Sequence, residues 1–358
     1  MGRETTNKPT NKRSKHAFLN NKKHKKYSQQ RRYTQWRKES LQGIIMSLTK
    51  KTLATLAISS FAFNVYANQC ETVRFADVGW TDITATTAVT SELLKGMGYK
   101  TKTDLLSVPV TYSSMANGDI DVFLGNWMPT MEGDIAKYRE AGTVETVRAN
   151  LEGAKYTLAV PKYVYDAGVT SFADLAKNAD KFKDRIYGIE PGNDGNRIIQ
   201  SMIDTDAFGL KDFSVVESSE AGMVSQVSRA VRRSQWIVYL GWAPHPMNSN
   251  VEMEYLSGDD DFFGANYGGA SVYTNVRSNY LSECKNVGQL LQNLAFSLEM
   301  ENELMENILN QKMTPEKAAQ QWLNKNPQQV KAWLENVKSL QGGAANKSVT
   351  EYLKQVKA

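Results

Sequence analysis

The stretch Leu124-Gly125-Asn126-Trp127-Met128-Pro129 ends an apolar run that predicts a β-strand, and it places an indole between an amide and a proline. Two other stretches share this pattern: Val78-Gly79-Trp80-Thr81-Asp82 and Leu240-Gly241-Trp242-Ala243-Pro244. In each of the three, the glycine and the polar residues predict that a loop or helix begins at the tryptophan. Indoles at the carboxyl ends of strands line a crevice in an open α/β sheet.

Three indoles in one crevice indicate the chemistry of a ligand. A quaternary ammonium ion carries no N–H and cannot donate a hydrogen bond, whereas aromatic faces attract it through cation–π interactions. The pattern therefore predicts a binding protein for a methylated amine. The other tryptophans of the chain after residue 67 are predicted to be core residues: Trp236 within a strand, and Trp322 and Trp333 on amphipathic helices.

The organisation after residue 67 is an alternation of strand-like and helix-like segments, which predicts an α/β fold with parallel-rich sheets flanked by helices on both faces. About 290 residues is more than one small core needs, so two lobes are expected. The predicted strands are 73–78, 119–124, 156–160, 186–189, 215–216 and 236–240. The predicted helices are 83–94, 173–182 and 223–231, followed by a mostly helical region beyond residue 280.

The beginning of the chain has a different character. Residues 1–45 carry thirteen Lys and Arg against two acidic residues. This segment is interpreted either as a nucleic-acid or membrane-surface tail or as an unstructured leader or upstream sequence. The second interpretation is favoured, because a secretion signal begins at Met46 with Lys50 and Lys51.

The expected signal peptide spans residues 46–67. Its apolar segment, 53–65, is too short to span a bilayer of roughly 30 Å. It is followed by the small-residue pattern Val65-Tyr66-Ala67, so cleavage after Ala67 would leave a periplasmic protein of residues 68–358. A lipid anchor on Cys70 is the less favoured alternative, because the residues before it do not match the usual processing pattern.

Cleavage at this point changes the net charge. Residues 1–67 hold fifteen Lys and Arg and two Glu, so their removal takes the chain from +5 to −8. An acidic exported protein gives no support to nucleic-acid binding and favours a cationic solute.

Cys70 and Cys284 are the only cysteines of the sequence. In an exported protein an isolated pair predicts a disulfide rather than a metal site. If both belong to one lobe, that lobe is discontinuous: it comprises 68–155 plus 266–358, and residues 156–265 form the second lobe. Gly153-Ala154 and the glycine-rich run 264–269 are the expected hinges between the lobes.

Several long runs of this sequence resemble the substrate-binding proteins of bacterial ABC importers for choline and betaines, and most of all the members that bind choline. The resemblance covers nearly all of 68–358. It rests on the runs 77–84, 122–130, 154–158, 188–197 and 241–247.

The resemblance implies a two-lobe, type II-like periplasmic binding fold that acts as a monomer, without a cofactor, and delivers its ligand to an ABC permease in the inner membrane. The aromatic box of the family falls on Trp80, Trp127, Tyr156 and Trp242. The polar contacts of the family to the alcohol end of the ligand fall on Asp82 and Asn193.

Asp82 has two interpretations. Asp is among the best helix N-caps, so Thr81 or Asp82 could simply cap the helix that follows. As a ligand contact, its carboxylate would accept a hydrogen bond from the hydroxyl of choline and repel the carboxylate of glycine betaine. Asn193 has a similar alternative, since it or Asp194 could cap a helix after the glycine turn at 192.

Catalysis finds little support. After residue 67 the only histidine is His245, between two prolines, and neither a Gly-x-Ser-x-Gly elbow nor a His-rich metal spacing occurs. The run 192–197 lacks the Lys-Ser/Thr of a P-loop. No catalytic or metal-ligating residue is therefore predicted. The remaining alternatives are a glycine or proline betaine-binding protein and, in a different class, a choline-ester hydrolase.

Overall fold

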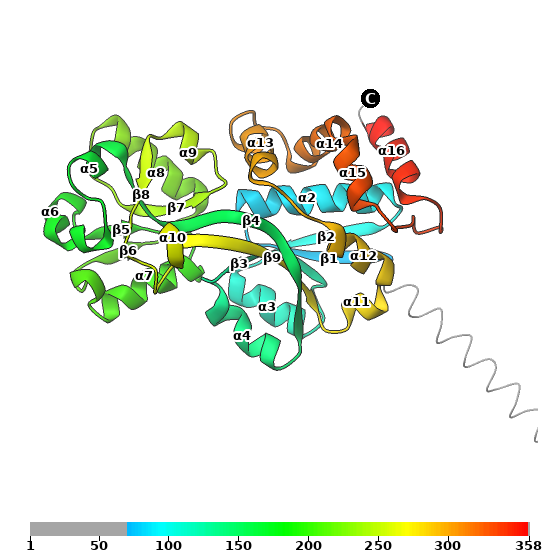
Figure 1. The fold of residues 1–358 in the computed structure, drawn as a ribbon, viewed down its shortest axis with the longest axis horizontal. Coiled ribbons are helices and arrows are strands. Elements are labelled where there is room, and N and C mark those ends of the chain that lie inside the picture. Colours follow the sequence, from blue (N-terminus) through cyan, green and yellow to red (C-terminus); the bar gives the residue numbers. More distant parts are fainter. Residues whose placement is uncertain (1–69, 357–358) are drawn as a thin grey trace, which may run out of the picture. The chain divides into compact units, whose positions relative to one another are not determined.

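The computed structural model describes residues 70–356, and the basic segment 1–45 and the signal sequence 46–67 predicted above lie outside the described residues. In the described part the chain forms one nine-stranded mixed sheet with helices on its faces (Figure 1). Along residues 70–356, no helix combines the length and the apolar character needed to cross a bilayer.

The strand order of the sheet is β2-β1-β3-β9-β4-β7-β5-β6, and β8 pairs with β4 beside this path. The strands are β1 (Thr72–Asp77), β2 (Lys100–Leu105), β3 (Val122–Met128), β4 (Val144–Pro161), β5 (Arg185–Tyr187), β6 (Ser214–Val216), β7 (Tyr239–Ala243), β8 (Met253–Tyr255) and β9 (Gly269–Arg277). Parallel pairing occurs at the two ends of the sheet, where β1 pairs with β2 and β3, and β5 pairs with β6 and β7.

Two long strands join these parallel ends. β4 and β9 pair with each other in antiparallel register, β9 also pairs with β3, and β4 also pairs with β7. Figure 1 shows both strands running through the centre between two groups of elements. We call the group around β1, β2 and β3 lobe I, and the group around β5, β6 and β7 lobe II. Because strands form both crossovers, the hydrogen-bonded sheet is continuous from one lobe to the other.

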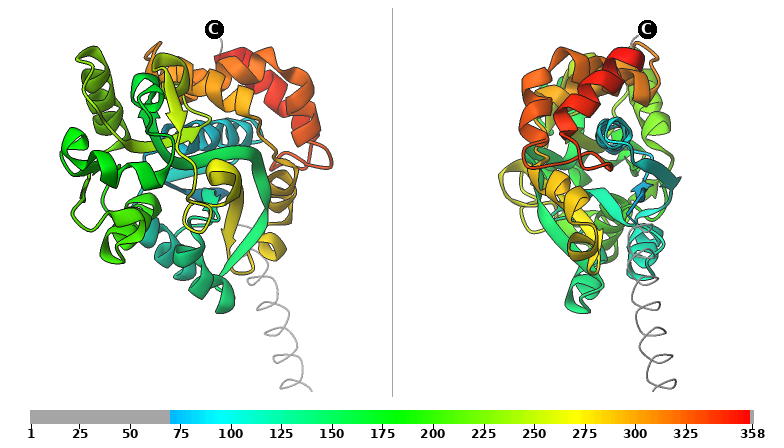
Figure 2. Two further views of the ribbon diagram at one scale, coloured as in Figure 1. Left: turned by 60° about the vertical axis from the view of Figure 1, so that its left-hand side comes forward. Right: turned by 90° about the vertical axis from the view of Figure 1, so that its right-hand side faces the viewer.

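Helices cover the sheet in both lobes. The α-helices are α2 (Thr81–Gly96), α3 (Val108–Ala116), α4 (Glu132–Glu140), α5 (Lys162–Asp166), α6 (Ala179–Phe182), α7 (Asp194–Asp204), α8 (Glu220–Arg232), α9 (Met247–Asn250), α10 (Ala265–Gly268), α11 (Tyr280–Glu283), α12 (Lys285–Asn293), α13 (Leu298–Leu309), α14 (Pro315–Lys325), α15 (Pro327–Trp333) and α16 (Ala345–Val356). The C-terminal helices α13, α14 and α16 pack against α2, so the end of the chain returns to lobe I (Figure 2).

The core of this helical layer contains two of the tryptophans predicted to be structural. Trp322 and Trp333 are buried and stack with ring centroids 5.6 Å apart. The strand position predicted for Trp236 was wrong, because β7 begins only at Tyr239. Trp236 is half-buried and packs against the core, under the ammonium group of Lys181. The predicted helix 173–182 is also broken, into the short 3-10 turns Phe172–Asp174 and Ala176–Asn178 followed by α6.

Trp127 and Trp242 lie at the carboxyl ends of their strands, as expected, and each is the last residue but one of its strand. Trp127 pairs with Val272 inside β3, and Trp242 pairs with Tyr156 inside β7. Gly125 is needed for close packing rather than for a turn, since a Cβ atom there would lie 2.7 Å from the Ile83 side chain. At Gly125 the glycine therefore marks tight strand–helix contact, which sequence cannot distinguish from a turn signal.

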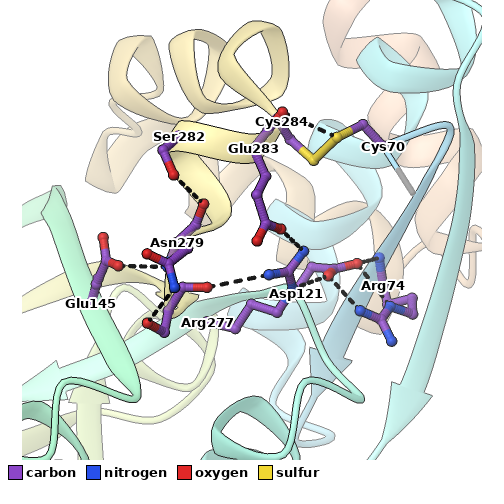
Figure 3. A network of polar contacts seen from close by, with 10 residues as sticks. Cys70, Arg74, Asp121, Glu145, Arg277, Asn279, Ser282, Glu283 and Cys284 are labelled. Atoms are coloured by element: carbon purple, nitrogen blue, oxygen red, sulfur yellow. Dashed lines mark hydrogen bonds and ion pairs between the residues drawn. A yellow bond between two sulfur atoms is a disulfide. The ribbon is translucent and has the colours of Figure 1, made fainter. Parts of the chain in front are cut away.

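Cys70 and Cys284 form a disulfide that ties the start of β1 to the end of α11. Figure 3 shows the ionic cluster beside it, in which the buried Asp121 lies between Arg74 and Arg277. Asp121 Oδ1 accepts hydrogen bonds from Arg74 at 2.6 Å and from Arg277 at 2.8 Å. Since Arg74 is on β1 and Arg277 is on β9, the disulfide and this cluster together fasten the N-terminal strand to the returning chain.

Candidate ligand-binding site

A small cavity lies where the two lobes meet. Its lining residues are Trp80, Asp82, Trp127, Tyr156, Ile189 and Trp242. The structure thus brings together all four predicted aromatic residues and the predicted carboxylate.

Each lobe contributes part of the lining. From lobe I, Trp80 immediately precedes α2, and Trp127 is on β3. From the β4–β7 pair, Tyr156 and Trp242 face each other in antiparallel register. Ile189 follows β5 in lobe II. The site is therefore complete only in an arrangement that brings α2 against lobe II.

The aromatic rings meet at steep angles. The Tyr156 ring lies 5.9 Å from Trp127 at an interplanar angle of 58°, and 6.5 Å from Trp242 at 80°. Phe263 supports the far side of Tyr156 in an edge-to-face contact at 5.7 Å. Rings oriented this way present several π faces to one small volume, which is the arrangement that attracts a cation without N–H groups.

Asp82 is the polar group of the cavity, and it is 1% exposed. Its Oδ2 accepts a hydrogen bond from Trp127 Nε1 at 3.1 Å, whereas its Oδ1 has no hydrogen-bond partner among residues 70–356. Burial, and then the negative charge of Glu220, raise the pKa of Asp82 to about 7. A buried acceptor without a partner is costly, so the cavity favours a ligand that supplies a donor, a positive charge, or both.

The alternative that Asp82 or Thr81 caps the helix was wrong. Trp80 is at the N-cap position of α2, and Asp82 lies within the first turn of the helix. There the negative charge of Asp82 interacts favourably with the helix dipole, but its side chain points to the cavity lining rather than to a capping position.

Asn193 does not line the cavity. It is the N-cap of α7, as one alternative predicted, and its Oδ1 accepts hydrogen bonds from Asn196 N at 3.1 Å and from the Tyr156 hydroxyl at 3.0 Å. Gly195 permits this contact, since a Cβ there would lie 2.1 Å from the Tyr156 hydroxyl oxygen. Asn193 therefore fixes the orientation of the Tyr156 ring by accepting a hydrogen bond from its hydroxyl, outside the cavity lining.

Sequence reasoning missed two carboxylates beside the cavity. Glu190 accepts a hydrogen bond from Trp80 Nε1 at 2.6 Å, and burial raises the pKa of Glu190. Glu220 is 5% exposed and accepts hydrogen bonds from the backbone and the hydroxyl of Thr81. Glu190 falls inside a run already noted, 188–197, but Glu220 opens an ordinary amphipathic helix and carries no local signal. With Asp82, both make the surroundings of the cavity acidic.

The arrangement suits capture of a small cation by aromatic faces and carboxylates. Within residues 70–356, no group of three or more His, Cys, Asp or Glu side chains is placed to hold a metal ion.

Comparisons with known proteins agree with this chemistry. A solved ABC-transporter choline binding protein in complex with choline shares 58% sequence identity, with a TM-score of 0.79 over 80% of this chain and 99% of that one. Lactococcal OpuAC, in a closed-liganded conformation with glycine betaine, shares 28% identity over 73% of this chain and 98% of that one, with a TM-score of 0.67. An uncharacterized protein, ORF1 of Chromohalobacter salexigens, is 56% identical over 155 residues, which are 43% of this chain and all of that protein.

A family model described as the substrate binding domain of ABC-type glycine betaine transport systems matches residues 71–325. The two-lobe fold, the interlobe cavity and this match agree, and the chain belongs to the family of extracytoplasmic substrate-binding domains of ABC-type glycine betaine transport systems.

Proposed function

We propose that this protein captures choline in the cavity between its lobes and presents it to an ABC permease. One observation carries the choice of ligand: the same small cavity contains aromatic faces and a buried carboxylate oxygen, Asp82 Oδ1, that has no hydrogen-bond partner among residues 70–356. The aromatic faces belong to Trp80, Trp127, Tyr156 and Trp242. The trimethylammonium group is held by the aromatic faces. The hydroxyl of choline donates to Asp82, which removes the cost of an unsatisfied buried acceptor.

The same carboxylate argues against glycine betaine as the preferred ligand. Its own carboxylate would enter a cavity that holds Asp82 and adjoins Glu190 and Glu220, and like charges in a desolvated site repel strongly. The 58% identity to a solved choline binding protein supports the choice of choline. Binding by aromatic faces needs no nucleophile, so we propose a binding protein without catalytic residues.

Isothermal titration calorimetry with choline, acetylcholine and glycine betaine tests this proposal. We expect saturable binding of choline, and weaker binding of glycine betaine. Tighter binding of glycine betaine than of choline would replace the proposal with its main alternative, a betaine-binding protein. Acetylcholine followed by NMR tests the hydrolase alternative, because a binding protein leaves the ester intact and an esterase releases acetate.

We also propose a division into lobes that matches the element groups. Lobe I comprises residues 68–155 plus 266–358, and lobe II comprises 156–265. The disulfide from β1 to α11 and the packing of α13, α14 and α16 on α2 support a discontinuous lobe I. Gly153-Ala154 and the run 264–269 remain the proposed hinges. The positive φ angles of Asn266 and Tyr267 in α10 mark unusual backbone between β8 and β9.

The exported protein is proposed to be periplasmic and to begin at Asn68. The expected mass of protein purified from the periplasm is that of residues 68–358, because the length of the apolar segment and the Val65-Tyr66-Ala67 pattern agree on this cleavage site. Intact-mass spectrometry measures it directly. A mass that retains residues 1–45 would contradict the leader interpretation, and the acidic net charge derived from it.

Choline affinity should rise with pH up to about pH 7 and then level off. Burial and the charge of Glu220 raise the pKa of Asp82 to about 7, and a bound cation favours the ionised carboxylate. Below pH 7 binding must therefore release a proton, and the affinity falls by at most about tenfold per pH unit. Titration calorimetry from pH 5.5 to 8.5 measures this profile.

Other carboxyl groups near the cavity also titrate, so the control is a variant that lacks the Asp82 carboxyl group. The charge of Glu220 on α8 raises the pKa of Asp82. Burial, and then the charge of Asp82, raise the pKa of Glu301 on α13, and burial raises the pKa of Asp194 to about 6. Asp82→Asn should flatten the profile. A profile that keeps its slope in this variant would assign the proton to one of the other carboxyls.

A further inference from the structure

The N-terminus of α2 is completed by a residue from the opposite lobe. Thr81 is the first residue of α2, and Trp80 at the N-cap makes no side-chain capping bond. Instead, Glu220 Oε2 accepts a hydrogen bond from Thr81 N at 2.8 Å, and Glu220 Oε1 accepts one from Thr81 Oγ1 at 2.6 Å. Glu220 begins α8 in lobe II, 139 residues along the chain. Its carboxylate thus takes the place of an N-cap side chain, at the end of α2 where the helix dipole favours negative charge.

His245 holds this carboxylate from the lobe II side. His245 Nδ1 accepts a hydrogen bond from Met247 N at 2.9 Å, so in the neutral ring the proton is on Nε2. Nε2 lies 3.1 Å from Glu220 Oε1 and donates to it. Both side chains are buried, with 5% and 2% exposure. Three donors therefore converge on Glu220, two from lobe I and one from lobe II.

This contact is one residue away from ligand-lining groups on both sides. Thr81 lies between Trp80 and Asp82, and both of these line the cavity. The Trp80 indole is held by a second lobe II carboxylate, Glu190. A third link, from Arg197 to Asp134 at 2.6 Å, lies at a more exposed position, where an ion pair contributes little. The buried contacts are those that position the binding residues.

We infer that Glu220 is a positioning residue for the ligand site: it caps α2 only when the lobes meet, and so links lobe closure to the placement of Trp80 and Asp82. Opening the lobes leaves Thr81 N and Thr81 Oγ1 without this acceptor, while closure satisfies both. The contact with His245 lies within lobe II and is present in either arrangement. The inference rests on the proposed function for its ligand, but the contact itself joins the two lobes whether or not a ligand is present.

The donors explain why a carboxylate is needed at this position. Gln has nearly the same shape as Glu, but one of its two terminal atoms is an amide nitrogen that donates. Placed against three donors, this amide leaves at least one donor–donor contact. Glu220→Gln should therefore weaken closure without removing packing volume. Thr81→Val keeps the backbone donor and the side-chain shape and removes only the hydroxyl. It should therefore weaken lobe closure as well, but by less than Glu220→Gln.

The test measures lobe separation and choline binding in the full exported chain. Spin labels at Asn117→Cys in lobe I and Ser225→Cys in lobe II report the interlobe distance by double electron–electron resonance, with and without choline. Stopped-flow fluorescence of the box tryptophans gives the association and dissociation rates. Glu217→Gln is the matched control: it removes the same charge three residues away, where Glu217 accepts from Asn196 within lobe II.

In Glu220→Gln we expect a broader distance distribution displaced to longer separation, and choline dissociation faster by about 10- to 100-fold, the loss expected for a buried charge-assisted hydrogen bond. Thr81→Val should change the interlobe distance and the choline dissociation rate in the same direction. Glu217→Gln should give the distances and rates of the parent protein. Unchanged distances and rates in both Glu220→Gln and Thr81→Val overturn the inference. If the parent protein does not bind choline at all, the proposed ligand fails, and the ligand-free distance distributions still decide the role of Glu220.

Discussion

Trp127→Ala is expected to weaken choline binding by roughly 10²- to 10³-fold. The substitution removes one π face, worth up to about 2 kcal/mol in a desolvated site. It also removes the Trp127 Nε1 donor at 3.1 Å from Asp82, so the carboxylate loses its indole partner. A lost hydrogen bond to a charged group costs about 1.5–3 kcal/mol, and the two losses together lead to the expected range. Titration calorimetry measures the change in affinity, and circular dichroism verifies the fold.

Two matched variants separate the ring from its polar atom. Trp127→Phe keeps an aromatic face and removes the Nε1 donor, so it should lose less affinity than Trp127→Ala. Tyr156→Phe keeps the ring and removes only the hydroxyl that donates to Asn193, so a loss below about tenfold is expected. An equally large loss in Tyr156→Phe and Trp127→Ala would show that the hydroxyl of Tyr156 matters more than its ring.

Asp82→Asn is expected to lower the choline-to-glycine betaine affinity ratio by roughly 10²-fold. Choline loses a charge-assisted hydrogen bond and a nearby anion, a change of about 1–3 kcal/mol. Glycine betaine is no longer repelled by this side chain, so its affinity should fall less or even rise. Asn can still accept the indole N–H, and the first turn of α2 tolerates a neutral residue, so the fold should survive. Calorimetry with both ligands at pH 8, where Asp82 is ionised in the parent, gives the ratio.

The control for this variant is Glu217→Asn, which removes a carboxylate at an exposed position outside the cavity lining. Its affinity ratio should equal that of the parent protein. If Asp82→Asn binds both ligands with an unchanged ratio, Asp82 has no part in selecting the far end of the ligand. The choice between choline and betaines would then have to come from another group, such as Glu190 or Glu220.

The sequence by itself determined the kinds of residue that form the site. Trp80, Trp127 and Trp242 could be selected because each belongs to a short strand context that periodicity and glycine placement reveal. Tyr156 was selected only through the resemblance to the family. Asp82 lies two residues after Trp80, and its selection as a ligand contact came from the same resemblance. The disulfide between Cys70 and Cys284 followed from counting, since only one pairing of two cysteines exists within the chain.

Only the tertiary structure decided how these residues are held. The continuous sheet through β4 and β9 supplies the strand partners of Trp127 and Trp242, Val272 and Tyr156, which are distant from them in sequence. Asp82 was expected to cap α2 as one alternative, yet the cap comes from Glu220 across the lobes. Local propensities depend on residues within a few positions of each other, whereas the partner of a buried donor depends on which distant segments meet. Glu220 therefore carries no sign of its role in the sequence around it, and its importance is visible only once lobe I and lobe II are in contact.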